Sequence, residues 1–241
     1  MSALRLAAGD PLEDVQAEAE RHLAFCRYAG FHMVVYCFLG QLQLMRSLRG
    51  QPDLQKNDPA SSDEAAVEQV FAQDPSFSIS ACWYWVRKLQ ARFHVGDYAS
   101  ALEMAARAER LLWTSPTFFG ELTEYHFYSA LAHAKVWDSA PKAEAPGHHQ
   151  ALAAHHARLA NWAGRCPDTF GSRATLAAAE VARIEDRVLD AEGLYEEALR
   201  SASTAGFANI EALASEMAGQ FYRKSGFERL ARSYFANASS C

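Results

Sequence analysis

Residues 218–238, A-G-Q-F-Y-R-K-S-G-F-E-R-L-A-R-S-Y-F-A-N-A, decide the fold of this chain. Small and aromatic residues recur in this stretch at helical spacing, namely Ala218, Gly219, Tyr222, Gly226, Phe227, Ala231, Phe235 and Ala238. Small residues let two helices approach closely, and aromatic side chains fill the space that remains between them. The stretch therefore predicts two packed helices with a turn at Gly226.

The same pattern occurs twice more in the chain. One copy, 40 residues earlier, consists of Asp186, Ala191, Tyr195 and Ala198. The other consists of Trp85, Gly96, Asp97, Tyr98, Ala101, Leu102, Ala105 and Ala108. The spacing is that of a tetratricopeptide helix pair, so the sequence predicts an all-α protein, with residues 1–241 forming one α-solenoid domain of antiparallel helix pairs. Ala101 and Ala231 are predicted to lie where the paired helices touch.

Apolar residues recur every three to four positions along most of the chain, with no sustained alternation of period two. Gly, Pro and helix-capping residues mark the ends of the predicted helices. The predicted helices are 11–29, 32–49, 63–73, 77–95, 97–113, one after Pro116 that includes 124–131, 148–165, 171–186, 188–204, 207–225 and 227–239. They give five antiparallel pairs and one short helix. A loop is predicted at 51–62 and a flexible linker at 138–147, because both stretches contain two prolines.

Composition and charge exclude several classes of function. Half of the 241 residues are apolar, which is enough for a substantial core, and the net charge of −6 argues against binding to nucleic acid or to an anionic membrane. Residues 31–45 are apolar but too few to span a bilayer, and residues 1–11 do not form a signal peptide. The five cysteines are odd in number and widely spaced, so we expect reduced, largely buried thiols in a cytoplasmic protein.

The sequence contains no familiar catalytic motif. It lacks a phosphate-binding Gly-x-x-x-x-Gly-Lys-Ser/Thr loop, a Gly-x-Gly-x-x-Gly fingerprint, a His-Glu-x-x-His metal motif and a Gly-x-Ser-x-Gly elbow. We therefore expect no enzymatic activity, no cofactor and no metal.

Two clusters were weighed as chemical sites. The four histidines His148, His149, His155 and His156 form pairs seven residues apart, about 10 Å along a helix, which is too far for one ion to bridge. A solvated helix face is the better interpretation. Glu121, Glu124 and His126 could act as acids and bases, but the stripe through Tyr125, Tyr128 and Leu131 favours packing.

The equivalence of the three repeats predicts an interaction surface along their first helices. Its residues are Trp83, Gln90 and Phe93 in one pair, Arg173, Glu180 and Arg183 in another, and Glu216, Gln220 and Arg223 in the last. A surface that is aromatic at one end and mixed in charge at the other suits a peptide or a neighbouring protein domain. Arg183 and Arg223 are expected to be exposed, so that reversing both charges leaves folding intact. The alternative is that the chain's own residues 51–62 or 138–147 fill this surface.

Seven stretches resemble the tetratricopeptide-like region of large bacterial signalling proteins: 9–12 (GDPL), 88–93 (KLQARF), 96–98 (GDY), 108–113 (AERLLW), 124–132 (EYHFYSALA), 161–167 (NWAGRCP) and 208–214 (ANIEALA). Those proteins join a Ser/Thr-kinase-like domain, an AAA-type predicted ATPase, this helical region, a GAF domain and a histidine kinase. The catalytic modules have no counterpart here, and Asp186 replaces the usual Gly of the repeat.

The resemblance implies a non-catalytic interaction or scaffold segment of a bacterial signal-transduction protein. Its partners would be a protein or peptide, above all adjoining ATPase, GAF or histidine-kinase modules. The alternative function is a small-molecule or peptide sensor, with an apolar pocket covered by the aromatic residues around Trp83 and Tyr128.

Overall fold

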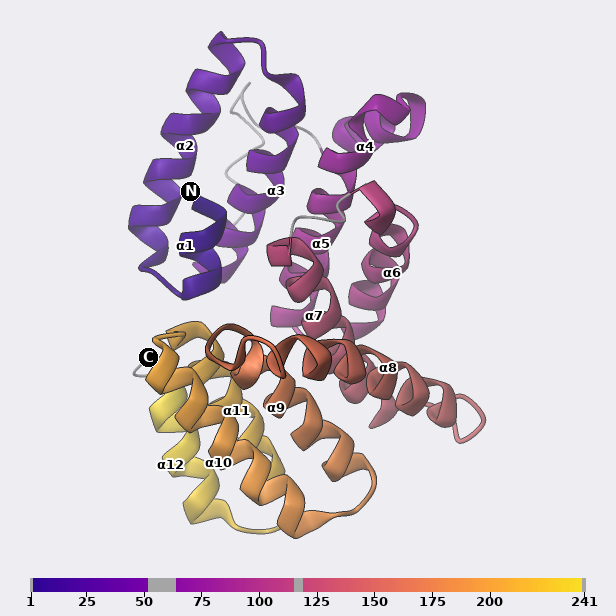
Figure 1. Ribbon diagram of the computed structural model, residues 1–241, viewed down its shortest axis with the longest axis vertical. Coiled ribbons are helices and arrows are strands. Elements are labelled where there is room, and N and C mark those ends of the chain that lie inside the picture. Colours follow the sequence, from indigo (N-terminus) through magenta and orange to yellow (C-terminus); the bar gives the residue numbers. More distant parts are fainter. Residues whose placement is uncertain (1, 52–63, 115–118, 240–241) are drawn as a thin grey trace. The chain divides into compact units, whose positions relative to one another are not determined.

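The computed structural model describes residues 2–51, 64–114 and 119–239, and this part of the chain is all-helical (Figure 1). Twelve α-helices and two short 3-10 helices occur in the described residues, and no strand does. The prediction of an all-α protein is therefore confirmed.

The helices lie close to the ranges predicted from sequence. Their bounds are α1 (Ser2–Ala8), α2 (Leu12–Tyr28), α3 (His32–Leu48), α4 (Glu64–Gln73), η2 (Pro75–Phe77), α5 (Ser78–His94), α6 (Tyr98–Glu109), η3 (Leu112–Thr114), α7 (Phe119–Trp137), α8 (Ala145–Ala163), α9 (Pro167–Ile184), α10 (Val188–Ala205), α11 (Ala208–Lys224) and α12 (Glu228–Ala238). Helix α1 was not predicted, because its seven residues are too few to repeat an apolar stripe.

Contacts divide the chain into two compact units. Unit 1 comprises residues 1–6 and 11–128, and unit 2 comprises residues 7–10 and 129–241. The division falls inside α1 and α7, so each of these helices contributes residues to both units. The sequence-based prediction of one continuous repeat domain stays a prediction.

Unit 1 is built around α2, α3 and α5. Its first core cluster joins Leu6 of α1 to α2 and α3 through Val15, Ala19, Leu23, Leu42, Leu44 and Met45. Helix α3 packs in turn on α5, and α5 packs on α6. Helix α3 approaches α5 closely at Gly40, where an added Cβ would lie 3.2 Å from the Cα of Tyr84. Residues 31–45, the most apolar window of the sequence, thus contribute to a buried helix interface.

In unit 2 each helix from α8 to α12 packs on the next one along the chain. The interfaces are rich in fully buried alanine, including Ala191, Ala198 and Ala231. An added Cβ on Gly219 would lie 2.8 Å from the ring of Phe235, so the small residue at 219 leaves space for the aromatic ring of α12. This is the role that the repeat pattern assigned to both residues.

The three turns that the repeat pattern makes equivalent share one backbone feature. Gly96, Asp186 and Gly226 have φ angles of 80°, 58° and 85°, all in the left-handed region. Glycine adopts this conformation without strain, whereas a residue with a Cβ does so at a cost. Asp186, which departs from the repeat's usual glycine, therefore carries backbone strain.

Replacing Asp186 by Gly is expected to raise the free energy of unfolding by up to about 1 kcal/mol, because the strain of the left-handed conformation is relieved. Urea denaturation of both proteins measures the difference. Gly96→Asp, the reverse change at the equivalent turn, is the matched control and should destabilise by a similar amount. Equal stabilities of Asp186→Gly and wild type would contradict the strain.

Ala101 and Ala231 are both fully buried, as the repeat register predicts. Ala→Leu at either position is expected to lower the free energy of unfolding by about 1–3 kcal/mol through overpacking. Thermal melts of the two variants provide the measurement, with Ala106→Leu on the exposed face of α6 as control. A Leu that leaves the melting temperature unchanged at both sites would disprove the register.

The predicted linker at 138–147 is more structured than expected. Asp138 forms ion pairs with Arg183 and Lys224, and α8 begins already at Ala145. Pro146 is compatible with this start, because the first turn of a helix does not need the N–H group that proline lacks. The predicted loop at 51–62 lies, apart from Gln51, outside the described residues.

The cysteines are less uniformly buried than expected. Cys26 and Cys82 are buried, Cys37 is half-buried and Cys166 is exposed, all with free thiols. Burial raises the pKa of the Cys37 thiol to about 12. Cys241 lies outside the described residues.

Nowhere in the described ranges is a helix both long and apolar enough to cross a membrane.

Candidate functional site

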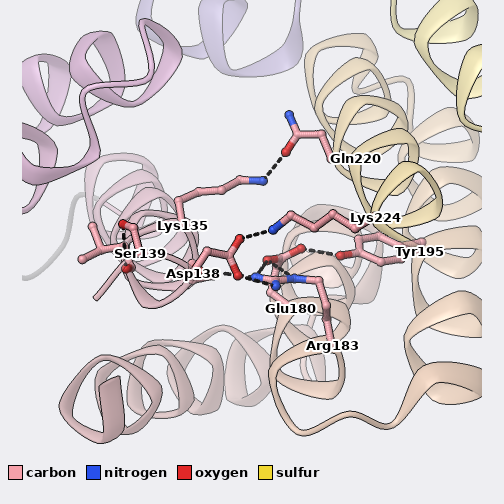
Figure 2. A network of polar contacts seen from close by, with 10 residues as sticks. Lys135, Asp138, Ser139, Glu180, Arg183, Tyr195, Gln220 and Lys224 are labelled. Carbon is pink, nitrogen blue, oxygen red and sulfur yellow. Dashed lines mark hydrogen bonds and ion pairs between the residues drawn. The ribbon is translucent and has the colours of Figure 1, made fainter. Parts of the chain in front are cut away.

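The most extensive polar cluster of unit 2 joins the end of α7 to α9, α10 and α11, as Figure 2 shows. We call it the α7–α9–α11 network, and its residues are Lys135, Asp138, Glu180, Arg183, Tyr195, Gln220 and Lys224. It contains three of the nine residues of the predicted interaction surface: Glu180, Arg183 and Gln220.

Arg183 and Glu180 form the centre of this network. The guanidinium donates from Nε and Nη2 to Glu180 Oε2, at 3.0 and 2.7 Å. It also donates from Nη1 to Asp138 Oδ1 at 2.7 Å and from Nη2 to the carbonyl oxygen of Ala134 at 3.3 Å. The Tyr195 hydroxyl donates to Glu180 Oε1. Because the Glu180 side chain is only 1% exposed, these bonds replace the water that a carboxylate would otherwise need.

The cations of the network hold its two carboxylates in their ionised forms. Burial by itself would raise the pKa of Glu180, but Arg183 and Lys135 outweigh burial and leave the pKa below its usual value. The pKa of Asp138 is also lowered, because Lys224 and Arg183 outweigh burial. Burial lowers the pKa of Lys135, whose ammonium group donates to Gln220 Oε1 at 2.5 Å. The centre is thus a fixed arrangement of alternating charges.

The edge of the network is open to solvent. The Lys224 side chain is 60% exposed and donates to Asp138 Oδ2 at 2.6 Å. Gln220 donates from Nε2 to Glu216 Oε1 at 2.9 Å, and Glu216 is exposed. A partner could therefore reach Lys224, Glu216 and part of Asp138, whereas Glu180 is inaccessible.

The structure corrects the expectation that Arg183 is exposed. Its side chain is only 12% exposed, because the end of α7 covers it. Reversing its charge is therefore expected to disturb folding. The alternative weighed from sequence, that the chain's own residues 138–147 fill this surface, applies to Asp138.

Arg223 is exposed, as expected, but it does not join the network. Its guanidinium lies over the ring of Phe235 in α12, 5.2 Å from the ring centroid. The next residue, Lys224, points to the network instead.

The other predicted surface residues are mostly buried. Arg173 is 3% exposed, donates to the carbonyl oxygen of Ala7 at 3.1 Å and lies over the ring of Phe207. In unit 1, Gln90 and Phe93 are buried, and Trp83 is half-buried. Arg173, Gln90 and Phe93 therefore stabilise the fold and are not available to a partner.

A second buried polar cluster lies in unit 1, between α5 and α7. Arg87 donates to Glu121 Oε1 at 2.6 Å and to Gln90 Oε1 at 2.8 Å, and Gln90 donates to Glu124 Oε2 at 2.8 Å. Burial and the neighbouring Glu124 raise the pKa of Glu121, with Arg87 opposing them. Glu121 and Glu124, weighed as catalytic acids, thus take part in a buried structural network, and Tyr125 and Tyr128 are buried as the packing interpretation predicted.

The histidine cluster gains a member that the sequence did not suggest. His133 of α7 lies 2.9 Å from His148, Nδ1 to Nδ1, and its ring stacks on His155. His149 lies 3.1 Å from Glu185 instead. In the described ranges no group of three or more His, Cys, Asp or Glu side chains has the geometry of a metal site.

His133 provides a prediction about pH. Burial, followed by the charges of His155 and His148, lowers its pKa from 6.5 to about 4, so the folded state favours the neutral ring. Between pH 6.5 and 4 the unfolded state therefore binds a proton at His133 more readily than the folded state does. The contribution of the neutral ring to the free energy of unfolding is complete above pH 6.5 and is lost as the pH falls through this window. His133→Gln should reduce the loss of stability across that window by about 1–2 kcal/mol. Urea melts at pH 7 and pH 4.5 measure it, and identical pH dependence in both proteins would refute the cause.

Two clefts bear on the alternative of a sensor. One, of about 230 Å³, is lined by Gln43, Arg46, Ser47, Gln51, Glu64, Lys88, Ala91, Arg92 and Val95. The other, of about 460 Å³, is lined by Glu196, Leu199, Arg200, Ser203, Glu211, Leu230, Ser233, Tyr234 and Asn237. Most residues that line the two clefts are polar or charged, although the surface they expose is divided about evenly between polar and apolar atoms, whereas ligand pockets are lined predominantly by apolar side chains. The aromatic residues expected to cover a pocket pack on one another, with Phe93 and Tyr128 ring centroids 5.4 Å apart.

Comparisons with known proteins identify no relative of this chain. No family model, no curated protein and no solved structure matches the chain.

Proposed function

We propose that this chain is a non-catalytic interaction segment of a bacterial signal-transduction protein, and that its helices form a tetratricopeptide-like solenoid. The connections of three residues at 185–187 and 225–227 support the solenoid, because so short a turn makes successive helices antiparallel neighbours. The resemblance of the seven sequence stretches supports the signalling context.

The observation that carries the interaction function is the open edge of the α7–α9–α11 network. Lys224, Asp138 and the adjoining Glu216 offer both signs of charge to a partner, and an ion pair with the half-buried Arg183 holds Asp138 in place. Fixed charges of both signs select a partner with the opposite pattern and reject others. An adjoining ATPase, GAF or histidine-kinase module is the partner that the resemblance suggests.

The test uses the purified chain and separately purified ATPase, GAF and histidine-kinase modules of the bacterial signalling proteins that it resembles. Biolayer interferometry should detect binding to at least one module. Lys224→Glu should raise the dissociation constant by about tenfold or more, because it places two like charges at the edge of the network. Arg200→Glu, which changes an equally exposed cation on α10, is the matched control and should leave binding unchanged.

Two results would overturn the proposal: absence of binding to every module, or equal weakening by Lys224→Glu and Arg200→Glu. Calorimetric titration with Mg-ATP tests the non-catalytic part, and it should give no heat of binding because no phosphate-binding motif is present in the sequence. Micromolar binding of Mg-ATP would point to a nucleotide site instead.

A further inference from the structure

Helix α2 of unit 1 has an exposed face at regular helical spacing. We call it the α2 outer stripe, and its residues are Asp14, Ala17, Arg21, Ala24, Phe25 and Tyr28, all exposed. At 100° per residue these six side chains fall within about one third of the helix circumference. The opposite face, with Val15, Ala19, Leu23 and Cys26, is buried against the core.

Aromatic exposure on this stripe is high. Tyr28 is 93% exposed and Phe25 is 61% exposed. Phe25 also contacts the ring of Phe31, which is 53% exposed, at 6.4 Å between centroids. Aromatic residues and arginine are enriched in protein interfaces, whereas lysine, aspartate and alanine are depleted. Phe25, Tyr28 and Arg21 of the stripe belong to the enriched types.

The two charges of the stripe are arranged so that they can pair between two copies. Asp14 and Arg21 are seven residues apart, about 10 Å along the axis, so they are too far apart for an ion pair within one helix. Neither side chain has an ion pair or hydrogen bond to another side chain within the described ranges. If a second α2 packs antiparallel, with the two-fold axis beside Ala17, Asp14 faces the partner subunit's Arg21 and Arg21 faces the partner subunit's Asp14.

We propose that a second copy of this chain docks on the α2 outer stripe, in an antiparallel α2–α2 contact with two-fold symmetry. Ala17 lies next to the axis, where a small side chain lets the two helices approach. Phe25 and Tyr28 lie toward the two ends of the contact. One patch serves both subunits, as a two-fold interface requires.

The balance of charge favours a protein over a lipid surface as the occupant. Binding to an anionic membrane requires an excess of Lys and Arg. The stripe has one cation and one anion, and the chain as a whole has a net charge of −6. Self-complementary charge is explained by a second copy and not by a membrane.

Sedimentation equilibrium of the full chain over a range of concentrations tests the proposal. Wild type should show a monomer–dimer equilibrium. Asp14→Arg or Arg21→Asp alone should raise the dimer dissociation constant by about tenfold or more, since each change creates two like-charge contacts across the axis. The double variant Asp14→Arg, Arg21→Asp should restore it to within about threefold, because both pairs form again with reversed sign. Circular dichroism checks that each variant is folded.

A second measurement is independent of charge. In a Cys166→Ser background, Ala17→Cys should form a disulfide-linked dimer on mild oxidation, because the two residues at 17 face each other across the axis. Ser233→Cys, exposed on α12, is the control and should remain monomeric. A monomeric wild type at all concentrations, a double variant no better than the single ones, or equal cross-linking of both cysteine variants would each overturn the proposal. Vesicle binding lost in the Phe25→Ser, Tyr28→Ser variant of a monomeric protein would identify a membrane as the occupant instead.

Discussion

Arg183→Ala is expected to lower the free energy of unfolding by about 3–5 kcal/mol, because it leaves the buried Glu180 carboxylate without its main partner. Arg183 donates two hydrogen bonds to Glu180, and the carboxylate is only 1% exposed. Lys135 and Tyr195 remain nearby and can compensate only in part. Urea denaturation monitored by circular dichroism gives the difference.

Two control variants separate the loss of the ion pair from the loss of side-chain volume. Lys224→Ala removes an exposed partner of Asp138 and should cost no more than about 1 kcal/mol. Combining Arg183→Met with Glu180→Gln should recover much of the lost stability, because no uncompensated charge then remains buried. If Arg183→Ala is as mild as Lys224→Ala, the network contributes little and Arg183 behaves as the surface residue that the sequence suggested.

Gly40→Leu is expected to lower the free energy of unfolding by about 3 kcal/mol, the upper end of the usual range for overpacking. The first atom that the new side chain meets is the Cα of Tyr84, 3.2 Å from the position of Cβ. Backbone in the middle of α5 cannot move aside as a flexible side chain can, so α3 and α5 must separate.

Gly193→Ala is the matched control for this substitution. Gly193 also lies inside a helix, α10, but an added Cβ there meets no atom within 4 Å. The change should therefore raise the free energy of unfolding by about 0.5–1 kcal/mol through helix propensity alone. Opposite signs for the two glycines would confirm the close approach of α3 to α5. Stabilisation by both substitutions would exclude it.

Helix formation and turns could be predicted from sequence because they depend on neighbouring residues. The period of the apolar stripes identified eleven of the twelve helices, and the glycines at 96 and 226 identified turns that have positive φ. Helix α1 was missed because a single short helix shows no period. The prediction of a flexible linker at 138–147 rested partly on Pro146, because proline usually interrupts a helix. In the structure Pro146 lies in the first turn of α8, where proline is tolerated.

The candidate site could be predicted only in part. Glu180, Arg183 and Gln220, which the repeat register assigned to one surface, all take part in the network of Figure 2. The residues that complete the network, Lys135 and Asp138, come from α7 and the segment after it, 42 to 85 residues away in sequence. No periodic pattern links them to α9 or α11.

The repeat register also failed to predict which of two adjacent residues of α11, Arg223 or Lys224, joins the network. Successive residues point about 100° apart, so one faces α12 and the other faces the network. The register matched Arg223 to Arg183, but the space beside Gly219 admits the Phe235 ring, over which Arg223 lies.

The sequence by itself determined the all-α class, the positions of most helices and the turns of the repeats, because backbone conformation follows from local side-chain chemistry. Only the tertiary structure decided which charged residues are buried. Arg183 and Arg223 hold equivalent positions in the repeat, yet the end of α7 covers the first and leaves the second exposed. Burial depends on which distant segment packs on a helix face, and that packing is a property of the whole chain.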